Sequence, residues 1–343
     1  MFPGPNTTAL ATFAEDPRPK VVVFSVMWIS VLYIPVITIG NLLVIATTYL
    51  VKKLHTPDNF VLAGLAIADL LVGVWSLPLY ILAEIPATLP MIRSQRWTCS
   101  LRYISNSISQ CSSLSLLILM CVDRFMAINW PFWYQRHVTN TRMMLVMSVI
   151  FAIHLTRAYV VYVQLMRFDV TIQPLTKRCT FNSNAPHLYM LILAIEIGVQ
   201  LLFALCLCAQ VSMTALNQAR KMQQDFENLG IEMSESLQNR LASVKITLSL
   251  MYLFIVLWAP TILATEIEKL LGSKAAISYR LLTRIPRLAN SFLNPLVYAF
   301  SRDIYRKAYW YLLTTPPNRW EELSRKLRGD ETLTGETVRV RST

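Results

Sequence analysis

Seven long apolar segments dominate this sequence and limit the folds that are open to it. Their approximate limits are 21–51, 59–85, 98–128, 143–166, 187–213, 243–271 and 279–300. Each is long enough for an α-helix to cross a bilayer, which needs about 20 mainly apolar residues. Strands do not fit, because the segments lack alternation and an open sheet cannot satisfy its backbone hydrogen bonds in lipid. The expected fold is an all-α membrane protein, a seven-transmembrane helix bundle.

Composition and charge favour a membrane protein over a soluble one. Of the 343 residues, 54% are hydrophobic and 15% are charged, whereas a soluble domain has roughly 45–50% apolar and about 25% charged residues. The net charge of +12 does not indicate nucleic-acid binding, because the basic residues form short clusters between apolar segments, as in loops that flank membrane helices. The expected partner is therefore the lipid bilayer and not nucleic acid.

The bundle, residues 21–300, leaves only short segments outside it. Residues 1–20 lack the basic start and early apolar core of a signal peptide, and a glycosylation sequon at Asn6 agrees with an extracellular N-terminus. Apolar and basic residues separate at helical spacing over 301–314, which predicts an amphipathic helix in the inner membrane interface. The polar remainder, 315–343, is expected to be a disordered cytoplasmic tail. The basic residues by themselves leave the orientation in the membrane open.

An acid inside an apolar segment needs a reason, because ionisable groups in a bilayer are costly. Asp69 lies deep in the second segment, within LAIADLLVG. Two interpretations are open: neighbouring helices satisfy the carboxylate, or it belongs to a cation site. One acid among neutral oxygens can hold a small hard cation. The side chains expected in the same layer are those of Asn41, Ser113, Asn290 and Asn294.

Two apolar segments contain a proline, which removes a backbone hydrogen bond and bends a helix. The seventh contains Asn294-Pro295, and the sixth contains Trp258-Ala259-Pro260. A bent helix with a large aromatic side chain at the bend is a candidate moving part. The third segment closes with Asp123-Arg124, which is either an anchor that reaches the interface or a functional charged pair.

Together these motifs resemble the rhodopsin-like (class A) G-protein-coupled receptors over about residues 22–313. The matching elements are Gly40-Asn41, LAIADLL around Asp69, Cys99, Asp123-Arg124-Phe125, Trp258 with Pro260, NSFLNPLVY over 290–298, and the amphipathic helix that follows. Each is weak alone, but their order and spacing make a strong pattern. The run NSFLNP, and CSSLSLLILMCVDRFMAI before it, resemble most the amine and adenosine receptor group.

The resemblance implies a multi-pass receptor of the plasma membrane, with the N-terminus outside and no enzymatic activity. It implies an inner switch that meets a heterotrimeric G protein, and arrestin as a further partner; the switch residues are Asp123, Arg124 and Tyr298. It also implies a disulfide between Cys99 and Cys179. No cofactor is expected beyond an allosteric sodium ion, for which the resemblance supplies a pocket of Asn41, Asp69, Ser113, Asn290 and Asn294, with Asp69 and Ser113 as metal ligands.

Several positions depart from the family pattern. Phe125 replaces a tyrosine, Phe151 a tryptophan, Gln200 a proline, Cys208 an inner tyrosine, and Arg240 an acid at the foot of helix six. Because Arg124 and Arg240 repel one another, the departure predicts a weakened inactive-state latch and elevated ligand-free signalling. The missing tyrosine at Cys208 acts in the opposite direction.

An N-terminus of about 20 residues is too short for a ligand-binding domain, so the ligand is expected to enter the bundle. Asn106 stands where amine receptors have an aspartate, and an amide cannot neutralise a buried ammonium. Glu196 either serves instead or pairs with Arg157. The expected ligand is therefore amine-like, zwitterionic or anionic.

The outer halves of the segments are otherwise basic. Guanidinium groups there suit carboxylates or phosphates, or else they extend to the lipid headgroups; the arginines concerned are Arg102, Arg157, Arg284 and Arg287. The predicted ligand contacts are Asn106, Arg102, Glu196, Trp258, Thr261 and Arg284.

Three other functions compete with a signalling receptor. A transporter commonly shows repeated halves, which this sequence lacks. The four histidines have no metal-ligand spacing, which disfavours a membrane-embedded enzyme. The departures at Phe151, Gln200 and Cys208 leave open a receptor-like protein that serves in trafficking, dimerisation or as a decoy without coupling to G proteins.

Overall fold

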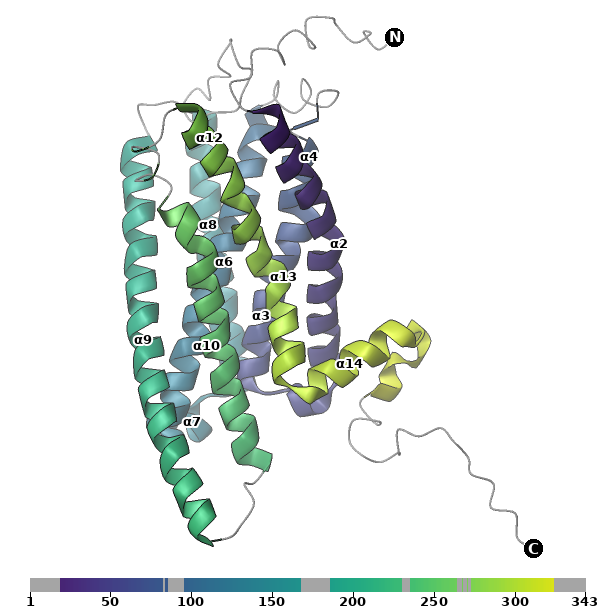
Figure 1. Ribbon diagram of the computed structural model, residues 1–343, viewed down its shortest axis with the longest axis vertical. Helices are drawn as coiled ribbons and strands as arrows, with labels where there is room; N and C mark the ends of the chain where they lie inside the picture. Colours follow the sequence, from purple (N-terminus) through teal and green to yellow (C-terminus); the bar gives the residue numbers. More distant parts are fainter. Residues whose placement is uncertain are drawn as a thin grey trace, which may run out of the picture.

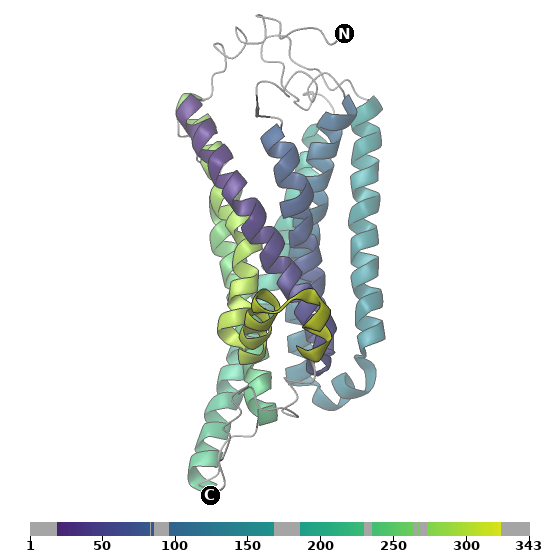
Figure 2. The ribbon, with the colours of Figure 1, turned by 90° about the vertical axis from the view of Figure 1, so that its right-hand side faces the viewer.

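Helices make up all the regular structure in the described part of the chain. The computed structural model describes residues 19–82, 84–85, 96–167, 186–229, 235–263, 267, 270 and 273–323. Seven helical units lie side by side in a single bundle (Figures 1 and 2): α2 (Lys20–Leu50), α3 (Pro57–Leu71) continuing through η2 (Val72–Ser76) into α4 (Leu77–Leu82), α6 (Arg96–Asn129), α8 (Asn140–Arg167), α9 (Pro186–Leu229), α10 (Glu235–Ile262), and α12 (Ser273–Leu282) with α13 (Arg284–Ser301). The expected all-α bundle is confirmed.

Six of these units, within the described ranges, are long and apolar enough to cross a membrane. The seventh, α12 with α13, is more polar because it contains Arg280, Arg284 and Arg287 as well as buried asparagines. Large apolar side chains on the outside of the bundle, such as Leu32 on α2 and Leu155 on α8, are exposed. A surface of this kind suits contact with lipid.

Four short elements lie at one end of the bundle, which we term the inner end. They are η1 (Lys52–Leu54), α7 (Pro131–His137), α14 (Asp303–Thr314) and η3 (Pro317–Glu322). Helix α14 lies across the other helices rather than along them (Figures 1 and 2). It buries Tyr305, Ala308 and Leu312 against the main core and leaves Trp310 72% exposed.

The chain remains ordered beyond residue 314, where a disordered tail was expected. Trp320 Nε1 donates to the carbonyl of Thr315 at 2.9 Å, and Leu323 is 1% exposed in the core cluster. These two apolar side chains pack next to α14, which gives the turn η3 enough buried surface to be ordered. Residues 324–343 lie outside the described ranges.

A π-helical turn, η2, separates α3 from α4. Leu77 N–H bonds to Val72 O, five residues earlier, and Pro78, which follows, has no N–H to offer. Gly73 in this turn lets α2 approach closely: a Cβ there would lie 2.9 Å from Thr38 Oγ1 and 3.0 Å from Ile37 Cγ2. Small residues at such contacts bring membrane helices together.

Replacing Gly73 with valine is expected to destabilise the protein by about 1–3 kcal/mol, because the branched side chain of Ile37 must be displaced from a packed interface. Thermal unfolding of the purified protein in detergent measures the loss. Gly198→Val on α9 is the matched control, since a Cβ at Gly198 meets nothing within 4 Å. Equal melting temperatures for the two variants would contradict the close packing of η2 on α2.

Candidate functional site

A buried polar cluster forms around Asp69, which is 0% exposed on α3. Its Oδ1 accepts hydrogen bonds from Ser113 Oγ of α6 at 3.3 Å and from Ser291 Oγ of α13 at 2.8 Å. Its Oδ2 accepts a hydrogen bond from Asn294 Nδ2 at 2.6 Å. The carboxylate thus joins three helices inside the bundle. Ser291 was not among the predicted residues, although its spacing of one helical turn from Asn294 places it on the same face.

Asn41 supports this cluster from α2 without bonding to the carboxylate. Its Nδ2 donates to the backbone oxygen of Ser291 at 3.0 Å and to that of Ile37 at 2.9 Å. Helix α2 is therefore tied to the segment of α13 that carries two of the Asp69 donors.

Three amide oxygens in this region are buried without a hydrogen-bond donor. They are the Oδ1 atoms of Asn41, Asn290 and Asn294. Buried polar atoms normally have a partner, and one carboxylate with several neutral oxygens is the hard donor set that suits a small cation. The residues present fit a sodium ion.

A second polar network lies at the inner end, around Arg124 of α6. Asp123 and Arg124 are 1% and 8% exposed, and the guanidinium hydrogen-bonds to the neighbouring carboxylate. Tyr134 of α7 donates to the other oxygen, Oδ1, of Asp123 at 2.7 Å. Burial and the Asp123 charge raise the pKa of Tyr134, so the phenol remains a neutral donor at physiological pH.

Arg124 also approaches a carboxylate from another helix. Its Nη2 lies 3.9 Å from Asp58 Oδ2. Asp58 is in the first turn of α3, where the helix dipole favours negative charge, and its Oδ1 accepts a hydrogen bond from Thr56 Oγ1 at 2.5 Å. This contact was not predicted from the sequence.

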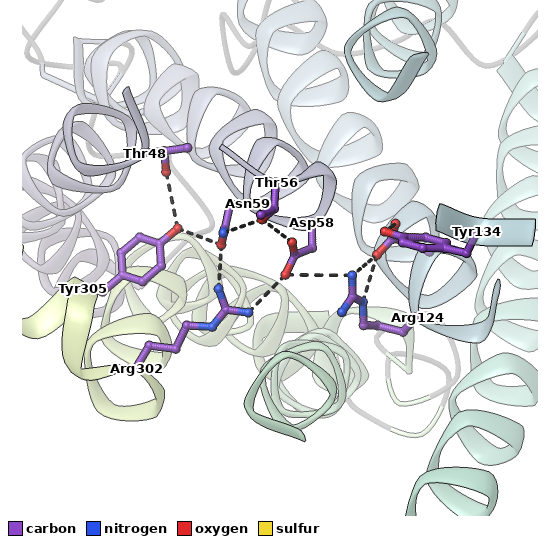
Figure 3. Close-up of polar contacts among 9 residues, drawn as sticks. Thr48, Thr56, Asp58, Asn59, Arg124, Tyr134, Arg302 and Tyr305 are labelled. Carbon is purple, nitrogen blue, oxygen red and sulfur yellow. Dashed lines mark hydrogen bonds and ion pairs between the residues drawn. The ribbon is translucent and has the colours of Figure 1, made fainter. Parts of the chain in front are cut away.

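The network continues from Asp58 to the junction of α13 and α14, as Figure 3 shows. Arg302 donates from Nη2 to Asp58 Oδ2 at 3.1 Å and from Nη1 to Asn59 Oδ1 at 2.8 Å. Tyr305 of α14 donates to the same Asn59 oxygen at 3.2 Å. Burial raises the pKa of Tyr305 to about 12, so this phenol is also neutral. Asp58 therefore bridges two arginines, one on α6 and one at the start of α14.

Tyr298, the third predicted member of the inner switch, lies beside this network. It is fully buried on α13, its hydroxyl has no hydrogen-bond partner, and its ring centroid is 5.8 Å from that of Tyr305. No hydrogen bond joins it to Arg124 among the described residues. Helix α10 carries Arg240, but the side chain of that arginine lies outside the described part of the structure.

The segment of α10 around Pro260 contacts α12 and α13. Trp258 stacks on Phe254, with ring centroids 5.0 Å apart. Tyr279 donates to the carbonyl of Pro260 at 3.0 Å, and Thr261 Oγ1 donates to the carbonyl of Thr283 at 3.3 Å. Thr261 therefore joins helices α10 and α13 at the outer end of the bundle.

The predicted ligand contacts separate into different environments. Arg157 Nη1 of α8 donates to both carboxylate oxygens of Glu196 on α9, at 2.7 and 2.6 Å, and Gln200 donates to the same carboxylate. Of the two interpretations of Glu196, the structure contains the pair with Arg157. Arg284 lies over the ring of Tyr80, 4.5 Å from its centroid.

Several predicted residues fall outside what the structure describes. Helix α6 includes the backbone of Arg102, Asn106 and Cys99, but the structure does not describe their side chains. The predicted disulfide partner Cys179 and the glycosylation site Asn6 lie in segments that are not described at all. These remain predictions.

Comparison with known proteins places this arrangement in a family. Residues 40–298 match the family described as 7 transmembrane receptor (rhodopsin family). Trace amine-associated receptor 9 of Mus musculus is 26% identical over 301 residues, which cover 85% of this chain and 84% of the relative. The 5-hydroxytryptamine receptor 2C of Canis lupus familiaris is 24% identical over 329 residues, which cover 82% of this chain and 70% of the relative. Adenosine receptor A3 of Ovis aries is 25% identical over 300 residues, which cover 84% and 92%.

The family match spans most of the chain, and the relatives include both amine and adenosine receptors, as the motifs predicted. A receptor of this family is a multi-pass membrane protein and not an enzyme. The resemblance seen in the motifs is thereby confirmed, and the chain belongs to the rhodopsin family of seven-transmembrane receptors.

Proposed function

We propose that this protein is a plasma-membrane receptor with its N-terminus outside the cell. It binds a small extracellular ligand in the outer half of the bundle and activates heterotrimeric G proteins at the inner end. The observation that carries the proposal is the environment of Arg124. This guanidinium is 8% exposed and is held by carboxylates from two helices, Asp123 and Asp58. Such a group can be released when the inner end opens.

The mechanism is a shift between two populations. In the closed state the inner network holds α3, α6, α7 and the start of α14 together. A ligand that binds the open state more tightly moves the equilibrium by its differential affinity. The outer end of α10 is linked to α12 and α13 through Pro260 and Thr261, so a ligand beside Trp258 acts on the helix expected to move. Arrestin would bind the same inner opening.

A sodium ion belongs to this proposal as an allosteric ligand. Asp69 and Ser113 would hold it, with Asn290 and Asn294 contributing amide oxygens and Asn41 supporting the pocket. The support is the buried carboxylate and the amide oxygens that lack donors. The ion would supply positive charge next to Asp69, whose described hydrogen-bond donors are all neutral.

The test is complex formation with purified heterotrimers made nucleotide-free by apyrase, for each Gα class. A nucleotide-free heterotrimer stabilises the open receptor by mass action, so no ligand is needed. Wild type should form a complex with at least one class. Arg124→Ala should weaken it by about 10- to 100-fold, as expected for lost charge-assisted hydrogen bonds.

Arg306→Ala is the matched control. Arg306 lies on α14 with its side chain 60% exposed and pairs with Asp303, so its loss should leave the complex intact. If no heterotrimer binds wild type, the chain is instead a receptor-like protein of trafficking, dimerisation or decoy type. If wild type and both variants bind alike, Arg124 does not carry the coupling. The departures at Phe151, Gln200 and Cys208 are what favour that second candidate.

A further inference from the structure

Arg287 is a partly buried cation that forms no ion pair among the described residues. It lies on α13, about one helical turn outward from Asn290 and Ser291. Its Nε is buried and has no hydrogen-bond acceptor. Among the described residues no carboxylate lies within ion-pair distance of its guanidinium. Taking an ion out of water is unfavourable unless it is paired, so a guanidinium without a described carboxylate partner needs an explanation.

A second buried donor faces the same place. The indole Nε1 of Trp258 is buried without an acceptor, and the guanidinium carbon of Arg287 lies 5.8 Å from the centroid of the Trp258 ring. Native structures leave few such atoms unsatisfied, and those that exist often mark a site for a missing group. Two adjacent donors that both lack an acceptor define a site for an acceptor-only ligand.

The surrounding charges select the sign of that ligand. Arg284 lies three residues before Arg287, on the same face of α13, and it too has no described carboxylate within ion-pair distance. Glu196 is paired with Arg157, and none of the ion pairs among the described residues joins the buried acid Glu84 to Arg284 or Arg287. An ammonium ligand would be repelled by two arginines, and no free acid among these groups would neutralise it.

We propose that Arg287 and Trp258 bind the carboxylate of a small organic monoanion. The guanidinium fork takes the two carboxylate oxygens in parallel, and the indole N–H donates a third hydrogen bond. A monoanion fits better than a phosphate dianion, because each further buried charge adds a desolvation cost. This assignment deepens the proposed function and rests on it, because the anion contacts Trp258, two residues before Pro260 of α10.

The test is thermal unfolding of the purified receptor in detergent, at constant sodium concentration and ionic strength. The probe is 3-phenylpropanoate. Its matched controls are 3-phenylpropanamide, which has no charge, and 3-phenylpropylamine, which has the opposite charge. The carboxylate should raise the melting temperature of wild type, and the two controls should not.

Arg287→Met, which keeps the length of the side chain without the charge, should have two effects. It should raise the melting temperature of the ligand-free protein, because the cost of a partly buried cation without a carboxylate partner is removed. It should also weaken the carboxylate effect by at least about tenfold in concentration, as expected when a charged hydrogen-bond pair is lost. Trp258→Phe should weaken it less, and Arg306→Met should match wild type in both respects.

The assignment is overturned if 3-phenylpropanoate fails to stabilise wild type, if it stabilises Arg287→Met equally, or if the amine is the better ligand. If inorganic phosphate raises the melting temperature as much as 3-phenylpropanoate does, and Arg287→Met loses this effect, the anion site stands but the proposal of an organic monoanion is overturned. The nucleotide-free heterotrimer assay is run on the same preparation. If the receptor forms a complex with the heterotrimer but the carboxylate does not stabilise it, only the proposed ligand class is wrong. If the carboxylate stabilises the receptor but no complex forms, only the proposed signalling role is wrong.

Discussion

Replacing Asp58 with asparagine is expected to raise ligand-free G-protein activation about fivefold, because a partly buried ion pair contributes about 1 kcal/mol. The pair joins Arg124 Nη2 and Asp58 Oδ2 at 3.9 Å, with side chains that are 10% and 16% exposed. Asparagine preserves the volume and can still accept the hydrogen bond from Thr56. The change therefore removes the charge that holds Arg124 toward α3, and it also weakens the ion pair between Asp58 and Arg302 at the start of α14 (Figure 3).

The measurement is nucleotide exchange on the responding heterotrimer, with wild type and variant at equal receptor concentration. Asp303→Asn is the matched control, since Asp303 forms an exposed pair with Arg306, in which both side chains are more than half exposed. It should leave exchange unchanged. A signal from Asp58→Asn at or below that of wild type would show that Asp58 does not hold the closed state.

The carboxylate of another helix that approaches Arg124 lies on α3 and not on helix six, where the family pattern has an acid. The repulsion between Arg124 and Arg240 predicts a latch weakened on the α10 side, whereas Asp58 supplies a carboxylate from α3. Arg240→Glu should then lower ligand-free exchange while Asp58→Asn raises it. Because the two substitutions act on the same guanidinium, their effects should not be additive.

Replacing Asp69 with asparagine is expected to abolish stabilisation of the receptor by sodium. An ion present at ten times its dissociation constant contributes about 1.4 kcal/mol to the stability of the state that binds it. The carboxylate is the only charge among the proposed ligands, and an amide offers a single neutral oxygen in its place. Melting temperatures in sodium chloride should therefore exceed those in potassium chloride for wild type and not for Asp69→Asn.

A pair of serine variants on α6 controls for changes in packing. Ser113 donates to Asp69, whereas Ser115, half a turn away, is hydrogen-bonded to His154. Ser113→Ala should reduce the sodium effect and Ser115→Ala should retain it. Equal melting temperatures of wild type in the two salts would remove the sodium ion from the proposal but leave the signalling role standing.

Much of the fold could be predicted from the sequence, because membrane insertion depends on a property that is summed locally. About 20 apolar residues suffice to specify a spanning helix. The family followed from motifs at fixed spacing, and these motifs also indicated Ser113 and Asn294 as neighbours of Asp69, whereas the donor Ser291 was missed. The interfacial helix could be predicted from its amphipathic spacing, although η3 after it could not, since its order depends on Trp320 and Leu323 packing next to α14.

What only the tertiary structure decided was which polar groups meet across helices. Arg302 and Asp58 are 244 residues apart in the chain, and so no local pattern indicates that they share a contact. The same holds for Glu196 and Arg157, where two interpretations were open until the side chains were placed. Arg287 shows the complementary case: the sequence shows an arginine in an apolar helix, but only the packing of α10 against α13 shows that its Nε, next to Trp258, is left without an acceptor. Hydrophobicity acts along the chain, whereas hydrogen bonds and ion pairs depend on distances of a few ångströms that the folded bundle alone determines.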